Sequence, residues 1–229
     1  MRFLFIFLFF AITLFTTPLF TADLSATESP EQIADRLQKK YDNMSSLVFD
    51  FYQHTEGNVT GRPKVGKGNA KFLKKDGRVL MRWDYTEPAV QVLISDGITF
   101  SMYFEEMNQQ IITSAETLES DITYAFFTGK GKLTEDFEIL PPDEHTKEAL
   151  IDAQKAQVIK LIPKKPQSQM QSIHVWVTDD SLIGRLQIRD HFDTVTTLSF
   201  DNMEIDTLVE VAIDFFTFNP PAGTEIISQ

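Results

Sequence analysis

The chain has 229 residues, 42% of them hydrophobic, with no cysteine and a formal net charge of −12 at pH 7. The lack of cysteine excludes disulfides, thiolate metal sites and an acylated cysteine. The acidic balance argues against nucleic acid as a partner, because affinity for nucleic acid comes largely from Lys and Arg on phosphates. It also argues against an anionic membrane surface, and we interpret most of the carboxylates as solubilising.

The first residues have the composition of a secretory signal peptide. Met1 and Arg2 give a positive start, and residues 3–15 form an apolar run without charge. This run is shorter than the roughly 20 residues of a spanning helix and fits the apolar region of a signal peptide. We expect a signal peptide at 1–22, with cleavage as late as residue 26, and a single domain at 23–229. An uncleaved membrane anchor is the alternative.

One amphipathic helix opens the remaining chain. The Ser-Pro-Glu sequence at residues 29–31 supplies a cap and a first turn. Ile33, Leu37 and Tyr41 then recur at helical spacing, and the helix is expected to end at residues 42–43.

Mostly extended segments follow, with Asp-Gly pairs at 76–77 and 96–97 that predict tight hairpins. A second helix is predicted from Ser114 to Thr128. Even spacing of short strands without strand–helix alternation predicts one curved antiparallel sheet or barrel. The extended candidates are 47–53, 67–75, 79–85, 90–94, 100–104, 109–113, 132–140, 157–162, 172–177, 184–190, 194–200 and 215–218.

Alternation within these strands gathers large apolar side chains on one side of the sheet. They either fill an ordinary core beneath the helices or line a ligand cavity, and the pattern alone leaves both interpretations open. The set is Leu47, Phe49, Phe51, Met81, Trp83, Tyr85, Val92, Ile94 and Met102.

Catalytic motifs are absent from the sequence. The histidines at positions 54, 145, 174 and 191 are far apart and show no metal-ligand spacing. There is no glycine-rich phosphate loop after a strand and no GxSxG turn. Two carboxylates facing each other in a groove remain conceivable as an acid–base pair, but no spacing singles one out. We therefore expect a protein that is not an enzyme, with no metal and no cofactor.

Several short motifs follow one another over nearly the whole mature chain. They are the SSLVFDFYQ segment at 45–53, GKG at 66–68, MRWDY at 81–85, LISDG at 93–97, the FF-x-G-x-G-x-L segment at 126–133, LIPKK at 161–165 and FTFNPPAG at 216–223. In their order and spacing these motifs resemble the outer-membrane lipoprotein-carrier (LolA) family. One departure is the segment before Trp83, where a family K-R-P or K-K-P sequence is replaced by Lys-Lys-Asp-Gly.

The resemblance implies a mainly β fold with a helical lid: an incomplete, half-open antiparallel β-barrel of about eleven strands covered by short helices. It implies a monomeric periplasmic chaperone whose cargo is acylated lipoproteins. An inner-membrane ABC transporter releases the cargo, and an outer-membrane lipoprotein acceptor receives it. The alternatives are a periplasmic lipid or lipoprotein sensor, or a carrier of another lipid, with the same half-barrel.

The resemblance and the face alternation together give candidate site residues. Those expected to contact acyl chains are Leu47, Phe49, Phe51, Met81, Trp83, Ile94 and Met102. Tyr41, Ile122 and Phe126 are expected lid contacts. Lys75 is the candidate for the basic residue that latches the lid in the family, with Lys74 next.

Overall fold

The computed structural model describes residues 28–57, 63–120, 124, 127, 131–144, 146, 156–167, 170–208 and 213–228. The predicted signal peptide, Ile122 and Phe126 lie outside these residues. No helix within the described ranges is long and apolar enough to span a bilayer.

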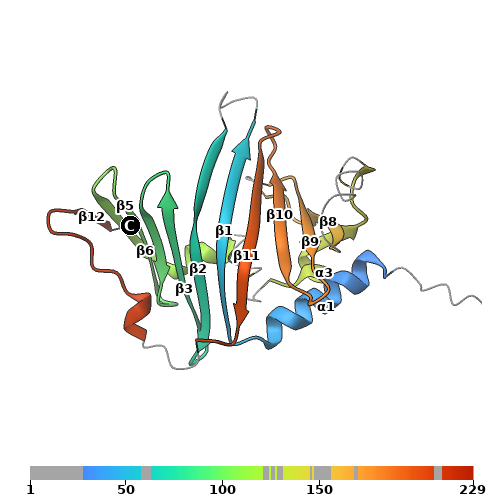
Figure 1. The fold of residues 1–229 in the computed structure, drawn as a ribbon, viewed down its shortest axis with the longest axis horizontal. Coiled ribbons are helices and arrows are strands. Elements are labelled where there is room, and N and C mark those ends of the chain that lie inside the picture. Colours follow the sequence, from blue (N-terminus) through green and yellow to red (C-terminus); the bar gives the residue numbers. More distant parts are fainter. Residues whose placement is uncertain are drawn as a thin grey trace, which may run out of the picture.

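A single sheet of twelve strands forms the body of the protein, in the order β12-β6-β5-β4-β3-β2-β1-β11-β10-β9-β8-β7 (Figure 1). Neighbouring strands are antiparallel except β12 and β6, which are parallel. β12 and β7 are the two edges, so the described sheet is open, and the expectation of an incomplete antiparallel barrel is confirmed with one strand more than expected. The strands are β1 (Ser46–Glu56), β2 (Lys64–Lys75), β3 (Arg78–Glu87), β4 (Gln91–Ser95), β5 (Thr99–Phe104), β6 (Gln109–Ser114), β7 (Phe137–Leu140), β8 (Gln157–Pro163), β9 (Ser172–Val177), β10 (Ile183–Arg189), β11 (Val195–Ile205) and β12 (Glu225–Ser228).

Helix α1 (Pro30–Asn43) forms where the sequence predicts it. Ser29 and Gln32 make a reciprocal capping box at its N-terminus, which satisfies backbone donors that the first turn leaves free. Its buried stripe is Ile33, Ala34, Leu37 and Tyr41, and it packs on β7, β8 and the short helix α3 (Leu133–Asp136). We call the face of the sheet that receives this stripe the inner face.

The hairpin between β2 and β3 has the predicted geometry. Asp76 and Gly77 both have positive φ, 51° and 73°, as a two-residue turn matching the twist of the strands requires. The long β1–β2 and β2–β3 ladders therefore begin from a fixed register, in which Phe72 lies opposite Met81 and Leu47.

Two extended predictions were wrong in part. Residues 133–136 form α3 before the chain enters β7, with the Asp136 backbone N–H donating to the Lys132 carbonyl at 2.8 Å. Residues 213–216 form the 3-10 helix η3 (Ile213–Phe216) instead of a strand, and the last strand is β12. The alternation of phenylalanines there reflects packing on the sheet and not strand pairing.

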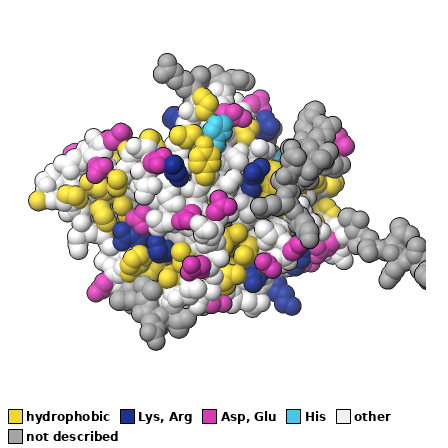
Figure 2. Space-filling view, in the orientation of Figure 1, with side chains coloured by type: hydrophobic (Ala, Val, Ile, Leu, Met, Phe, Trp, Pro, Cys, Tyr) yellow, Lys and Arg dark blue, Asp and Glu magenta, His cyan; other side chains and the backbone are white. Residues whose placement is uncertain are grey.

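Phe216 and Phe218 pack on the part of the outer face, opposite α1, that β2 to β5 form. Phe216 packs with Leu73 and Leu80, and Phe218 packs with the group formed by Val92, Ile94 and Tyr103. Elsewhere, in the view of Figure 2, apolar, acidic and basic side chains are interspersed on the surface, which suits a soluble acidic protein.

Candidate ligand-binding cavity

A cavity of about 600 Å³ opens on the inner face between the sheet and the segment that follows β6. This volume lies within the range of roughly 300–1,000 Å³ typical of small-molecule sites. The 3-10 helix η1 (Ala115–Ser120) borders it. The lining residues are Gln53, Phe72, Met81, Trp83, Tyr85, Leu93, Phe100, Met102, Thr113, Thr117, Leu118, Tyr124, Ile188, Thr196 and Leu198.

Strand register explains why these side chains meet. Trp83 lies opposite Ala70 on β2 and Leu93 on β4, and Leu93 lies opposite Met102 on β5. Directly opposite residues point to the same face, so one layer across four strands projects into the cavity. Ala70 is the small member of this layer and leaves room beside the large indole.

Aromatic rings form the floor beside the cavity. The Phe49 ring packs on those of Phe72, Trp83, Phe127 and Phe200, with centroids 4.8 to 6.1 Å apart. Phe127 belongs to the segment after η1 and is 1% exposed. The cover of the cavity is thus tied to the floor by a buried ring, and such contacts add to the free energy of burial.

A hydrogen-bonded group of polar side chains borders one end of the cavity, and Thr113 and Thr117 line the wall elsewhere. Tyr85 Oη donates to Gln53 Oε1 at 2.9 Å, and Gln53 Nε2 donates to Thr55 Oγ1 at 3.4 Å. Thr55 Oγ1 lies 3.0 Å from Thr196 Oγ1. These residues lie toward the end of β1 that is remote from α1, whereas Phe72 and Met81 lie toward the end near α1.

Three of the predicted contact residues line the cavity: Met81, Trp83 and Met102. The predicted Leu47, Phe49 and Phe51 lie in the buried cluster of the inner face, where Phe51 contacts the Trp83 ring at 4.6 Å. Tyr41 belongs to the same cluster and packs 6.1 Å from Phe127, and its hydroxyl accepts a hydrogen bond from the Ile183 backbone N–H. Burial raises the pKa of this hydroxyl, which keeps it neutral.

The predicted orientation of Ile94 is wrong, and so is that of Val92. Both side chains lie on the outer face with Tyr103, while Leu93 between them lines the cavity. The run Val-Leu-Ile is apolar throughout, so alternation could not identify the inner residue. The register with β3 does, because Leu93 lies opposite Trp83.

Lys74 contacts the end of α1, and Lys75 does not. Lys74 was the second candidate from the sequence. Lys74 Nζ donates to the Tyr41 carbonyl at 2.6 Å and lies 3.4 Å from that of Asp42. A cation there meets carbonyl groups that the helix leaves unpaired. Burial lowers the pKa of Lys74, opposed by the nearby carboxylates of Asp42 and Asp206. Across the described residues, Lys75 makes no hydrogen bond to a helix.

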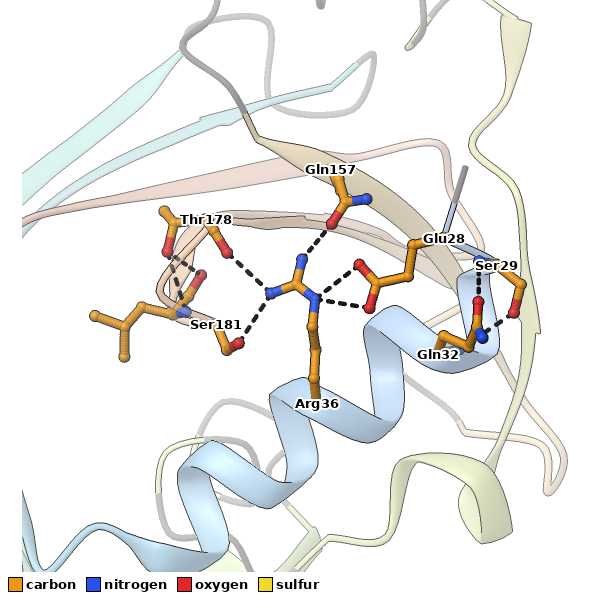
Figure 3. A network of polar contacts seen from close by, with 8 residues as sticks. Glu28, Ser29, Gln32, Arg36, Gln157, Thr178 and Ser181 are labelled. Carbon is orange, nitrogen blue, oxygen red and sulfur yellow. Dashed lines mark hydrogen bonds and ion pairs between the residues drawn. The ribbon is translucent and has the colours of Figure 1, made fainter. Parts of the chain in front are cut away.

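Arg36 fixes the other half of α1 to the sheet (Figure 3). Its guanidinium donates to the Thr178 carbonyl at 3.0 Å, Ser181 Oγ at 2.9 Å and Gln157 Oε1, and it pairs with Glu28. Thr178 and Ser181 belong to the β9–β10 turn and Gln157 begins β8. Arg36 therefore joins the helix to two separate parts of the sheet.

The described residues contain no group of three or more His, Asp or Glu side chains that could bind a metal ion. His174 Nε2 lies 3.3 Å from Asp143 Oδ2, and Lys160 Nζ donates to both oxygens of that carboxylate. Burial lowers the pKa of His174, partly offset by Asp143. This group lies on the outer face and apart from the cavity.

An open curved sheet with a covered, largely apolar cavity defines a half-barrel. The sequence model described as outer membrane lipoprotein carrier protein LolA matches residues 42–219. The chain therefore belongs to the LolA family, as its motifs predict.

Named relatives agree with this assignment. The outer-membrane lipoprotein carrier protein of Methylococcus capsulatus is 25% identical over 204 residues, covering 89% of this chain and 91% of the relative. That of Alkalilimnicola ehrlichii is 26% identical over 200 residues, covering 86% and 85%. A solved structure of an uncharacterized conserved protein from Thermus thermophilus superposes with a TM-score of 0.51 at 10% identity, covering 87% of this chain and 98% of that one. This last likeness shows the fold alone.

Proposed function

We propose that the protein is a periplasmic carrier that takes acyl chains of lipoproteins into its cavity and shields them from water. The observation that carries the proposal is the cavity of about 600 Å³, whose described lining residues are mostly apolar and carry no charge, in a chain of the LolA family. The two relatives described above are both named outer-membrane lipoprotein carrier proteins.

The energetics of acyl chains explain why a carrier is needed. Burial of each methylene contributes roughly 0.8 kcal/mol, so a long chain does not leave a membrane for water unaided. A carrier must replace most of that burial and still release its cargo. Phe72, Met81, Trp83 and Met102 offer such a surface, since aromatic rings and methionine make adaptable apolar contacts.

The route extends this proposal. Residues 1–22 direct export and are removed, and the domain at 23–229 works as a monomer in the periplasm. An inner-membrane ABC transporter releases the lipoprotein and consumes the ATP, so binding and not catalysis is the task of this chain. An acceptor at the outer membrane takes the cargo.

The anchoring of α1 supports a proposal for which part moves. Arg36, Lys74 and the Tyr41 hydroxyl hold α1 to the sheet at three places. The segment that begins with η1 contributes Thr117, Leu118 and Tyr124 to the cavity wall, so we propose that cargo enters by displacement of this segment while α1 stays in place.

A detergent-free binding assay tests the proposal. A peptide with an N-terminal diacylglyceryl cysteine is mixed with the purified mature protein in buffer, and the mixture is centrifuged. Native mass spectrometry then measures the masses of the protein species in the supernatant. We expect a soluble one-to-one complex. Met102→Glu places a charge on the cavity wall and is expected to reduce the complex at least tenfold, because a buried unpaired charge is costly.

Met107→Glu is the matched control, because Met107 is 56% exposed in the β5–β6 turn. It should bind as the wild type does. Normal binding by Met102→Glu and Trp83→Glu would contradict the placement of acyl chains in this cavity. A phospholipid bound in preference to the lipopeptide would instead assign the half-barrel to another lipid.

A further inference from the structure

The wall of the cavity becomes accessible to solvent at the end remote from α1. On β1 the inward side chain of Phe51 is 3% exposed, and the next inward residue, Gln53, is partly exposed. On β3 the same change occurs between Trp83, which is 6% exposed, and Tyr85, which is partly exposed. Gln53 and Tyr85 both line the cavity. A hydrocarbon chain that is held in the cavity and joined to a polar molecule in water can cross this boundary.

Strand β2 presents two glycines to the inner face at the same level. Gly66 lies opposite Gln53 and Gly68 lies opposite Phe51, so both occupy inward positions. The register between β2 and β3 shifts next to Gly68, which marks a bulge. A Cβ atom on Gly68 would lie 1.8 Å from the Asp84 carbonyl oxygen, so only glycine fits there.

The Tyr85 ring occupies the space that a side chain on Gly66 would fill. A Cβ atom on Gly66 would lie 3.0 Å from Cε1 and 3.3 Å from Cδ1 of this ring, closer than carbon atoms pack. Tyr85 Oη donates to Gln53 Oε1 at 2.9 Å, and the ring packs 4.8 Å from that of Phe51. The missing side chain on β2 and the hydrogen bond to β1 therefore let a ring from β3 lie across β2, against the sheet.

We infer that Gly66 and Tyr85 set the width of the passage through which a bound acyl chain joins the rest of the lipoprotein. With no side chain at position 66, the ring stays against β2 and leaves the passage clear. A side chain there lifts the ring, breaks its hydrogen bond to Gln53 and moves it into the space that the cargo occupies. Gly66 is therefore a positioning residue that acts through Tyr85. The inference rests on the proposed function, because the passage belongs to the same cavity.

Gly66→Val tests this inference in the detergent-free lipopeptide assay. Gly66 lies within a strand and has no positive φ, and valine favours extended backbone, so the effect falls on the neighbouring ring. We expect about tenfold weaker binding of the diacylglyceryl peptide, because the displaced ring overpacks the passage. Gly66→Ala requires the ring to shift by only a few tenths of an ångström and should weaken binding less.

Removal of the ring distinguishes an obstructed passage from a distorted sheet. In a Tyr85→Ala background, Gly66→Val has no ring to displace, so it should change the affinity for the lipopeptide by less than about twofold. Gly184→Val is the matched control. Gly184 lies in β10 outside the lining of the cavity, and an added Cβ meets Thr178 Cγ2 at an ordinary 3.5 Å. It should leave binding unchanged. The alanine substitution at Gly66 carries the same cycle if valine prevents folding.

Wild-type affinity in Gly66→Val would overturn the inference. An equal loss from Gly66→Val with and without the Tyr85 ring would also overturn it, because the loss would then come from the sheet. Complete loss of binding in Tyr85→Ala alone would do the same, since the ring would be a contact that the cargo needs. In all three cases the wild-type complex still stands, whereas a wild type that binds no lipopeptide contradicts the proposed function itself.

Discussion

Two regions of the inner face are built from the same sheet and filled differently. Over β8, β9 and the first part of β10, side chains such as Leu161, Val175 and Leu186 are completely buried in one cluster with the apolar stripe of α1. Over β3 to β6, Leu93 and Met102 remain partly exposed around a cavity covered by the segment that begins with η1. Proteins pack their interiors closely, so space left open in one half of a core indicates room for a ligand.

The difference shows that strand alternation alone does not create a cavity. Both halves present apolar residues inward, and the element laid over them decides which half is solid. The capped amphipathic helix α1 supplies Ile33, Leu37 and Tyr41 to one half, while the described residues of the segment after β6 supply Leu118, Tyr124 and Phe127 to the other. The packed half thus forms a fixed support, and the conformation of the cavity half can change on it.

The largest expected effect compares a leucine from each half. Leu186→Ala in the packed half should lower the free energy of unfolding by about 3 kcal/mol, because it leaves a void among completely buried side chains. Leu93→Ala at the cavity wall should cost about 1 kcal/mol and weaken lipopeptide binding instead. Urea unfolding of both variants measures this, and equal losses of stability would remove the distinction between the halves.

Removal of the Arg36 anchor should have the next largest effect. Arg36→Met leaves the Thr178 carbonyl, Ser181 and Gln157 without their donor and should destabilise the protein by about 2 kcal/mol. Lys39→Met, on the exposed side of the same helix, is the control and should change stability by less than about 0.5 kcal/mol. If both variants unfold at the same urea concentration, α1 is not anchored as described.

The two neighbouring lysines at the end of β2 test the latch. Lys74→Met removes the donor to the Tyr41 carbonyl and should cost about 1 kcal/mol, with faster hydrogen exchange in the last turn of α1. Lys75→Met, one residue further along β2, should leave exchange in α1 unchanged. Faster exchange in the Lys75 variant alone would restore the choice made from the sequence.

The smallest predicted effect is a dependence of stability on pH through His174. Burial lowers the pKa of His174 in the folded state below its ordinary value of 6.5. Below pH 6.5 the unfolded chain therefore binds a proton at His174 that the folded protein does not yet bind. The free energy of unfolding decreases as the pH is lowered, until the pH passes the folded-state pKa. In His174→Gln, the decline in melting temperature between pH 7 and pH 5 should be shallower. An unchanged slope would show that other groups govern it.

Local signals in the sequence predicted much of the fold and part of the site. Asp76-Gly77 and the cap at Ser29 mark their turns through backbone chemistry, and period-two alternation correctly placed Met81, Trp83 and Met102 inward. Ile94 was misplaced because its run has no polar residue to mark the faces. Phe216 was misassigned because packing onto a sheet and pairing within one can give the same pattern.

Contacts between distant segments were beyond local reasoning. Lys74 reaches a carbonyl 33 residues earlier in the chain, and Arg36 reaches a turn more than 140 residues later. Neither contact can be predicted from the spacing of residues or from composition.

The most direct test of the central claim is native mass spectrometry of the mature protein purified from the periplasm without detergent. We predict a one-to-one acylated lipoprotein passenger that is retained in Met107→Glu and lost in Met102→Glu. A protein that emerges empty, and that accepts no lipoprotein from loaded membranes, would contradict the carrier function.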